Sequence, residues 1–154
     1  LGMSFLDLGR YGKSLESLEK ALAIEPRDIK ILTALGEANY KSGRYQEALK
    51  HFAAAATEQP ELTDVYINIG ASYFQLREYT QAENSFRRAV ALNPNSAFAH
   101  LDLAITCLQM KRRDCALEGY TILKSLDPGL STSLFNALFA GRVLDVRTLP
   151  NQNH

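Results

Sequence analysis

Proline recurs in this chain at a fixed interval. Pro26, Pro60, Pro94 and Pro128 follow one another at steps of 34 residues. Proline inside an α-helix removes a backbone hydrogen bond and clashes with the preceding turn, so it marks places where helices end. Four such stops in one register indicate a repeated structural unit, and a period of this size is typical of helical solenoids.

Other residues keep the same register between the prolines. Two sets of small residues and one set of large apolar residues recur at the same step: Gly2, Gly36, Gly70 and Ala104; Ser14, Ala48, Ala82 and Ala116; Leu18, Phe52, Phe86 and Tyr120. Within each unit the apolar residues lie at helical spacing. The pattern predicts pairs of amphipathic helices over about residues 29–42 and 45–58, 63–76 and 79–92, and 97–110 and 113–126, after an opening helix cut short at Leu1.

The repeated pattern resembles the tetratricopeptide motif over about residues 1–128. The second unit carries it as Leu35, Gly36, Ala48, Phe52, Ala55 and Pro60, and the third as Tyr66, Ile69, Gly70, Tyr73, Ala82, Phe86, Ala89 and Pro94. The resemblance implies an all-α fold, a right-handed superhelical solenoid of antiparallel helix pairs, with about nine helices and hairpin turns at residues 9–11 and 43–45. The last unit departs most, since His100, Ala104, Cys107 and Leu123 replace the usual residues.

The expected domain organisation follows this register. A repeat domain spans residues 1–141, with repeats at about 1–28 (truncated), 29–62, 63–96 and 97–130. A capping helix is expected over 131–141, with Ser131 as its N-cap and Gly141 as its stop. Residues 142–154 are expected to form an extended or disordered tail.

Charge and hydropathy exclude two broad classes of function. The chain has 17 basic and 17 acidic residues, which leaves no basic surplus for nucleic acid. No stretch approaches the roughly 20 apolar residues of a membrane span. Because Leu1 falls inside a repeat, upstream sequence is expected to be lost or left out. A cytoplasmic location is slightly favoured, and a periplasmic or secreted one stays open.

No constellation of catalytic residues is recognisable. His51 is expected to be solvated, His100 to be a core residue, and His154 to lie in the tail. Cys107 and Cys115 lack metal-binding spacing. We expect free thiols, because helices usually pack about 8–10 Å apart and disulfides span less than about 7 Å between Cα atoms; a single bridge is the minor alternative. Neither a Gly-rich phosphate loop nor a nucleophile elbow occurs. The sequence therefore predicts no enzyme, no cofactor and no metal.

The resemblance implies a partner-binding groove along the concave side, lined by the first helix of each pair. A stripe offset from the packed one supplies its candidate residues: Lys30, Thr33, Glu37, Tyr40, Asp64, Ile67, Asn68, Ala71, Phe74, Phe98, Leu101, Ile105, Phe135 and Phe139. Chaperone-gripping relatives carry basic and amide residues at inner positions, and here only Asn68 fits, so that ligand is not expected. The stripe begins polar and becomes apolar. Some of its apolar residues, such as Leu108 and one of the phenylalanines, are expected to be core shared with the capping helix. The rest predict a partner, a second copy or the chain's own tail as a cover.

The leading interpretation is a protein–protein interaction scaffold that binds a peptide or helix of another protein in this groove. Two alternatives stay open. One is a regulatory or substrate-docking segment of a larger enzyme, and the other is a structural subunit of an assembly. The groove hypothesis predicts that replacing Phe74 and Leu101 with serine abolishes partner binding.

Overall fold

The computed structural model describes residues 5–139, and this part of the chain contains eight α-helices and no strand. The helices are α1 (Phe5–Ile24), α2 (Ile29–Lys41), α3 (Tyr45–Glu58), α4 (Thr63–Gln75), α5 (Tyr79–Leu92), α6 (Ala97–Gln109), α7 (Arg113–Leu126) and α8 (Pro128–Phe139). The expected bounds of α2 to α7 agree with these to within one residue. None of the described helices is both long and apolar enough to cross a membrane.

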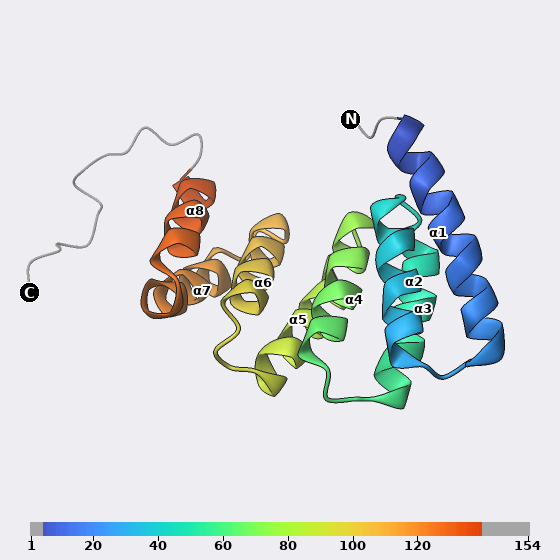
Figure 1. Ribbon diagram of the computed structural model, residues 1–154. Helices are drawn as coiled ribbons and strands as arrows, with labels where there is room; N and C mark the ends of the chain where they lie inside the picture. Colours follow the sequence, from blue (N-terminus) through green and yellow to red (C-terminus); the bar gives the residue numbers. More distant parts are fainter. Residues whose placement is uncertain (1–4, 140–154) are drawn as a thin grey trace, which may run out of the picture.

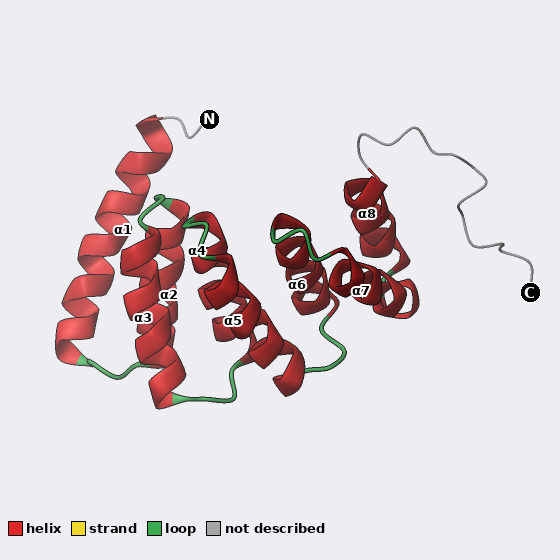
Figure 2. Cartoon of the chain, turned by 180° about the vertical axis from the view of Figure 1, so that it is seen from behind, coloured by secondary structure: helices red, strands yellow, loops and turns green. Residues whose placement is uncertain are grey.

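Sequential helices pack as antiparallel pairs. In Figure 1 the first helices of the pairs, α2, α4 and α6, face the viewer. Figure 2, seen from the opposite side, brings the second helices, α3, α5 and α7, to the front. The pairs α2 with α3, α4 with α5 and α6 with α7 make the most extensive contacts, and each pair packs against the next one along the chain. The predicted solenoid of stacked helix pairs is confirmed.

The turn inside each pair repeats one backbone conformation. Gly43, Arg77 and Lys111 occupy equivalent positions and have φ angles of 75°, 62° and 60°. Only glycine adopts this left-handed region without a steric cost, which is about 1–2 kcal/mol for other residues. The same tight turn is therefore strained in the last two pairs and relaxed in the first.

Small residues allow the two helices of a pair to pack closely. A Cβ added at Gly36 would lie 2.4 Å from Cε1 of Phe52, and one at Gly70 would lie 2.6 Å from Cε1 of Phe86. The alanines at 48, 55 and 82 are fully buried, and both phenylalanines are at most 2% exposed. Each glycine thus provides the space that the ring on the opposing helix fills.

The last pair solves the same packing problem with different residues. Ala104 replaces the glycine, and a Cβ added at Gly119 on the facing helix would lie 2.7 Å from the Ala104 Cβ. His100 is buried, as expected, and its Nε2 lies 2.8 Å from the Pro94 carbonyl oxygen. His51 is half-buried rather than solvated, and burial lowers its pKa.

Both ends of the described chain differ from the expectation. α1 is one continuous helix, so the turn at residues 9–11 does not form and residues 5–139 contain eight helices rather than the nine expected. Gly9 and Gly12 lie inside this helix, where each glycine costs only about 1 kcal/mol.

The last helix begins earlier than expected. α8 starts at Pro128 rather than Ser131, because proline suits the first helical position and the Asp127 Oδ1 accepts from the Leu130 N–H at 3.0 Å. Ser131 is buried inside the helix and is not its N-cap. The expected stop at Gly141 and the tail at 142–154 lie outside the described residues.

Candidate functional site

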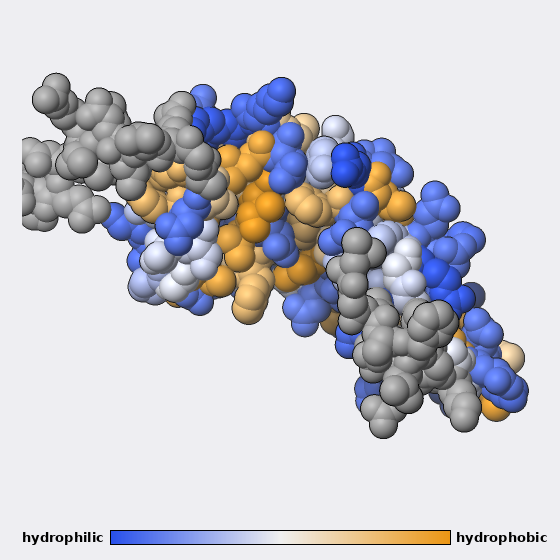
Figure 3. Space-filling view, turned by 90° about the horizontal axis from the view of Figure 1, so that it is seen from above, coloured by the Kyte–Doolittle hydropathy of each residue, from blue (hydrophilic) through white to orange (hydrophobic). Residues whose placement is uncertain are grey.

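A hollow of about 190 Å³ is lined mainly by residues of α2, α4 and α6, the first helices of the three pairs, and we call it the central hollow. Its walls are Tyr40, Ala71, Phe74, Gln75, Phe86, Asp102 and Ile105. Seen from above in Figure 3, hydrophobic residues gather over the middle and the C-terminal part of the chain, with hydrophilic residues around them.

The repeat register explains why these residues meet. Tyr40 and Phe74 hold the same position in successive first helices, and so do Ala71 and Ile105. Side chains at one register position lie side by side when helix pairs stack. The methyl group of Ala71 is much smaller than the Ile105 side chain at the equivalent position, which leaves space between α2 and α6.

Polar groups occupy one part of the otherwise apolar wall. The Gln75 side-chain amide donates to the Tyr40 hydroxyl oxygen across 3.4 Å. Burial raises the pKa of Tyr40, the hydrogen bond from Gln75 lowers it, and the charge of the nearby Asp102 raises it further. Three polar side chains from three helices thus converge on the central hollow.

The Asp102 carboxyl is the least usual of these groups. Burial raises its pKa to about 6, from 3.8 in an exposed side chain. Its backbone carbonyl accepts from the Thr106 hydroxyl at 2.7 Å, but within residues 5–139 its carboxyl has no hydrogen bond or ion pair. A carboxylate here loses hydration without gaining a protein partner.

Four of the groove residues expected from sequence line the central hollow: Tyr40, Ala71, Phe74 and Ile105. Other expected residues lie outside it. Lys30, Glu37 and Asp64 are exposed, Phe98 is 65% exposed, and Thr33, Ile67 and Asn68 are half-buried.

Packing at the C-terminal end accounts for the remaining expected residues. Leu101 and Phe139 pack against the core formed by α6, α7 and α8. The Phe135 ring lies 5.8 Å from that of Tyr120 and 4.5 Å from that of Phe139, and Arg113 lies over the Phe139 ring at 5.0 Å. None of these three expected residues lines the central hollow.

The three other lining residues are Phe86, Gln75 and Asp102. Phe86 packs within its helix pair, and Gln75 and Asp102 are inner positions of the first helices that carry polar side chains. A signal for Asp102 exists in the sequence, since an acidic residue stands between Leu101 and Leu103 on a helix that is apolar on most sides.

A second cluster links α5, α6 and α7. Cys107 and Cys115 form a disulfide, with their Cα atoms 6.0 Å apart, so the expectation of free thiols is wrong. That expectation used the distance between helix axes. The Cα atoms on facing sides of two helices lie closer than the axes do, within the usual range for a disulfide.

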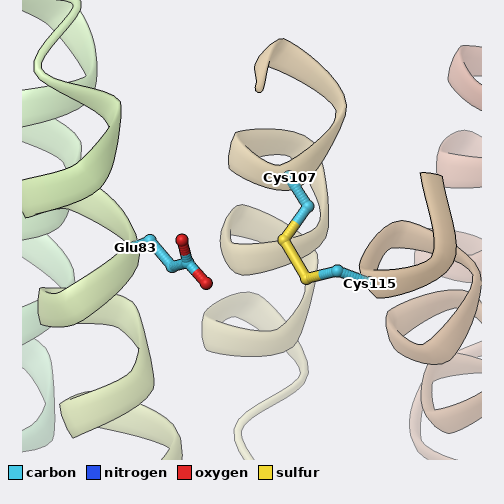
Figure 4. Close-up of side chains that lie close together, drawn as sticks. All are labelled: Glu83, Cys107 and Cys115. Carbon is cyan, nitrogen blue, oxygen red and sulfur yellow. A yellow bond between two sulfur atoms is a disulfide. The ribbon is translucent and has the colours of Figure 1, made fainter. Parts of the chain in front are cut away.

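Glu83 points towards this disulfide from α5 (Figure 4). Burial alone would raise the pKa of Glu83, but hydrogen bonds from Arg87 at 2.8 Å and Arg112 at 2.6 Å hold it below its usual range. Its carboxylate and the two sulfurs lie within 4.8 Å of one another, a distance that would suit a metal ion. The sulfurs are bonded to each other and both carboxylate oxygens accept from arginine, so this cluster serves to join helices.

Comparison with known proteins gives consistent results. Two family models, both described as tetratricopeptide repeat, match residues 1–62 and 63–96. A comparison with curated proteins gave no match. A crystal structure of MamA is similar with a TM-score of 0.80 and 22% identity, over 92% of this chain and 86% of that chain.

Two further solved structures share the fold. A structure of MamA AMB-1 gives a TM-score of 0.72 at 29% identity, over 84% of this chain and 76% of that one. The first TPR of Spaghetti (RPAP3), bound to an HSP90 peptide, gives 0.68 at 22% identity, over 71% of this chain and 89% of that one. The two family matches together cover residues 1–96 of 154, and the helix pairs repeat in the same register beyond them. The chain belongs to the tetratricopeptide repeat family.

Proposed function

We propose that this chain is an interaction scaffold that holds a peptide or helix of another protein in a groove centred on the central hollow. Tetratricopeptide repeat domains generally mediate protein–protein interaction and are typically non-catalytic. The observation that carries the proposal is the central hollow itself, an apolar recess with three converging polar groups on the face of the first helices. Packing within a helix pair does not require these residues to meet there.

The proposed groove extends from the hollow along the exposed residues of the first helices. Lys30, Glu37 and Asp64 form its polar part, and Phe98, 65% exposed, forms an apolar part beyond the hollow. We do not include Phe135 and Phe139 in the groove, because their rings pack where α8 meets the last helix pair. Burial of one apolar side chain contributes roughly 1.5–3 kcal/mol, so two or three anchors with backbone contacts are compatible with micromolar binding, which corresponds to about 8 kcal/mol.

The neighbouring structure with a bound HSP90 peptide supports the idea that this architecture can hold a peptide. The ligand of this chain must differ in charge. The HSP90 peptide, with the sequence SRMEEVD, is acidic at its end, whereas Glu37, Asp64 and Asp102 place carboxylates along the proposed groove. Carboxylates on both sides of an interface repel each other.

The test blocks the hollow with one large side chain. Phage-displayed peptides of random sequence are selected on the parent chain, and the affinities of enriched peptides are then compared for the parent, Ala71→Trp and Ala91→Trp. Ala71 lines the hollow, whereas Ala91 is exposed on α5, so the same change of volume is made inside and outside the site. The parent has no tryptophan, so the introduced indole also reports on folding through its fluorescence.

We expect Ala71→Trp to weaken peptide binding by about tenfold or more, since the indole fills the space of a buried anchor, and Ala91→Trp to leave it unchanged. If circular dichroism shows that Ala71→Trp has lost helicity, Gln75→Trp, at an exposed position on the rim of the hollow, takes its place. Equal binding by the parent and the blocked variant would contradict the proposal. So would a selection that enriches no peptide over an unrelated protein.

A further inference from the structure

We propose that the ligand of the central hollow is a peptide that presents an arginine or lysine side chain, and that this cation pairs with the Asp102 carboxylate. The inference rests on the proposed function and adds the chemical class of the ligand. It assigns Asp102 the part of a specificity-determining residue, with Tyr40 and Phe74 as the aromatic walls beside the incoming side chain.

The argument starts from what Asp102 lacks. Its carboxyl is half-buried at the edge of the hollow, and in the described part of the chain no lysine, arginine or hydrogen-bond donor contacts it. Glu83 provides the contrast inside the same molecule, because its buried carboxylate accepts hydrogen bonds from both Arg87 and Arg112. An unpaired buried charge destabilises a fold, and a partner that supplies the opposite charge removes this penalty.

The walls of the hollow match the rest of a basic side chain. Ala71, Phe74 and Ile105 offer apolar surface, and the methylene stems of lysine and arginine pack well on such surface while their charged ends reach a polar group. The rings of Tyr40 and Phe74 can also face the cation, an arrangement that is favourable when the cation is desolvated. The hydroxyl oxygen of Tyr40 and the amide oxygen of Gln75 are further acceptors for its N–H groups.

The charges around the hollow point in the same direction. Along the proposed groove the charged side chains are Lys30, Glu37, Lys41, Asp64 and Asp102, so carboxylates outnumber cations by three to two. An acidic peptide would be repelled, and a purely apolar one would leave Asp102 unpaired in a still drier site. A basic side chain among apolar neighbours can both pack against the apolar walls and pair with the Asp102 carboxylate.

The occupant we infer is a segment of another protein. The chain's own sequence after α8 also contains two cations, Arg142 and Arg147. These define the competing occupant, and the variant Arg142→Gln/Arg147→Gln in the full chain distinguishes the two. Unchanged peptide affinity in this variant supports a separate partner. Binding tightened about tenfold or more would show that the chain's own tail competes for the site, and would overturn the inference of a separate partner.

The main experiment uses the peptides selected on the parent chain. We expect the enriched sequences to carry arginine or lysine beside apolar residues. Selection on Asp102→Asn, which removes the charge and keeps the shape, should still enrich apolar residues but lose the preference for the cation. Asp114→Asn is the matched control, since Asp114 is an exposed carboxylate on α7, outside the proposed groove.

A binding cycle then isolates the pair. One enriched peptide is synthesised in two forms, with its basic residue intact or replaced by uncharged citrulline or norleucine. For the intact peptide, Asp102→Asn should weaken binding about tenfold or more and Asp114→Asn less than about twofold. For the uncharged peptide, Asp102→Asn should change binding less than about twofold, because the two changes remove the same interaction.

The outcomes separate this inference from the proposed function. If enriched peptides lose binding to Ala71→Trp but bind Asp102→Asn as well as the parent, the groove is correct and the inferred cation is wrong. If they bind Ala71→Trp as well as the parent does, the groove itself is wrong. A parent selection dominated by acidic peptides would also overturn the inference.

Discussion

Asp102→Asn should make the free protein more stable at neutral pH, although it removes a charged residue from a largely neutral helix. Asparagine has nearly the same shape and helix propensity as aspartate, and it carries no charge that burial would penalise. The Asp102 carboxyl has no protein partner within the described residues, so the substitution breaks no ion pair there. The expected gain therefore measures the cost of keeping an unpaired carboxylate in the hollow.

The magnitude follows from the shift in pKa from 3.8 to about 6. One pKa unit corresponds to about 1.4 kcal/mol, so full ionisation of Asp102 costs the folded state at most about 3 kcal/mol. Because the side chain is not completely buried, we expect a gain of about 1–3 kcal/mol for Asp102→Asn at pH 7.5.

The pH dependence has a definite sign. A folded-state pKa above the unfolded value means that the protonated carboxyl is favoured in the folded chain. The stability that Asp102 contributes is therefore complete below pH 3.8 and is lost as the pH rises through about 6. The gain of Asp102→Asn should be largest above pH 7 and should fall to about a third of its full value at pH 4.5.

Urea denaturation followed by circular dichroism at 222 nm measures these differences, with the parent, Asp102→Asn and the exposed control Asp64→Asn compared at pH 7.5 and pH 4.5. Asp64→Asn should be close to neutral at both values, because its carboxylate is hydrated in both states. A variant at position 102 that is less stable than the parent at pH 7.5, or a gain that does not depend on pH, would refute the reasoning. The first result would mean that the Asp102 carboxylate has a stabilising partner, and the second that its pKa does not differ between the folded and unfolded chain.

Three further predictions concern the repeat framework. Ala82→Leu should lower the free energy of unfolding by about 1–3 kcal/mol in urea titrations, because Ala82 is fully buried and the pair cannot open without loss of packing. Arg77→Gly should raise the free energy of unfolding by about 0.5–1 kcal/mol and Gly43→Ala should lower it by about 1 kcal/mol, since both positions have positive φ. Effects of the same sign for these two variants would argue against a shared turn conformation. Thiol titration of the unreduced, denatured chain should detect no free cysteine, which would favour an oxidising compartment, and replacing Cys107 and Cys115 with alanine should cost about 2–3 kcal/mol in thermal or urea unfolding.

The helix register could be predicted because it depends on many residues that agree. Each proline stop, each small residue and each large apolar residue indicates the same period, so a single departure changes little. Ala104 is an example: it replaces glycine in the last pair, and Gly119 on the facing helix gives back the space. The sequence shows both residues, but only the packing shows that they compensate each other.

Features that depend on one pair of atoms could not be predicted in the same way. Whether Cys107 and Cys115 bond depends on a Cα separation of 6.0 Å at one hairpin, and a general helix spacing does not determine it. The continuous α1 likewise depends on whether one helix tolerates both Gly9 and Gly12, at a cost of about 1 kcal/mol each. The repeat period determines neither the disulfide nor the continuity of α1.

Asp102 belongs to a third kind, because the repeat does not require any particular residue at its position. The glycines, alanines and aromatic rings that pack within each pair are sufficient to hold the helices together. The residues of the offset stripe are therefore free to vary. A half-buried, unpaired carboxyl at such a position reduces stability without helping the fold, and local conflicts of this kind concentrate at functional sites. The residues that make this chain a solenoid can therefore be found by their agreement with the period. The residue that selects the ligand is found instead where a polar side chain is buried without a partner. For this reason the carboxyl of Asp102, rather than the phenylalanines of α8, identifies the central hollow as the site.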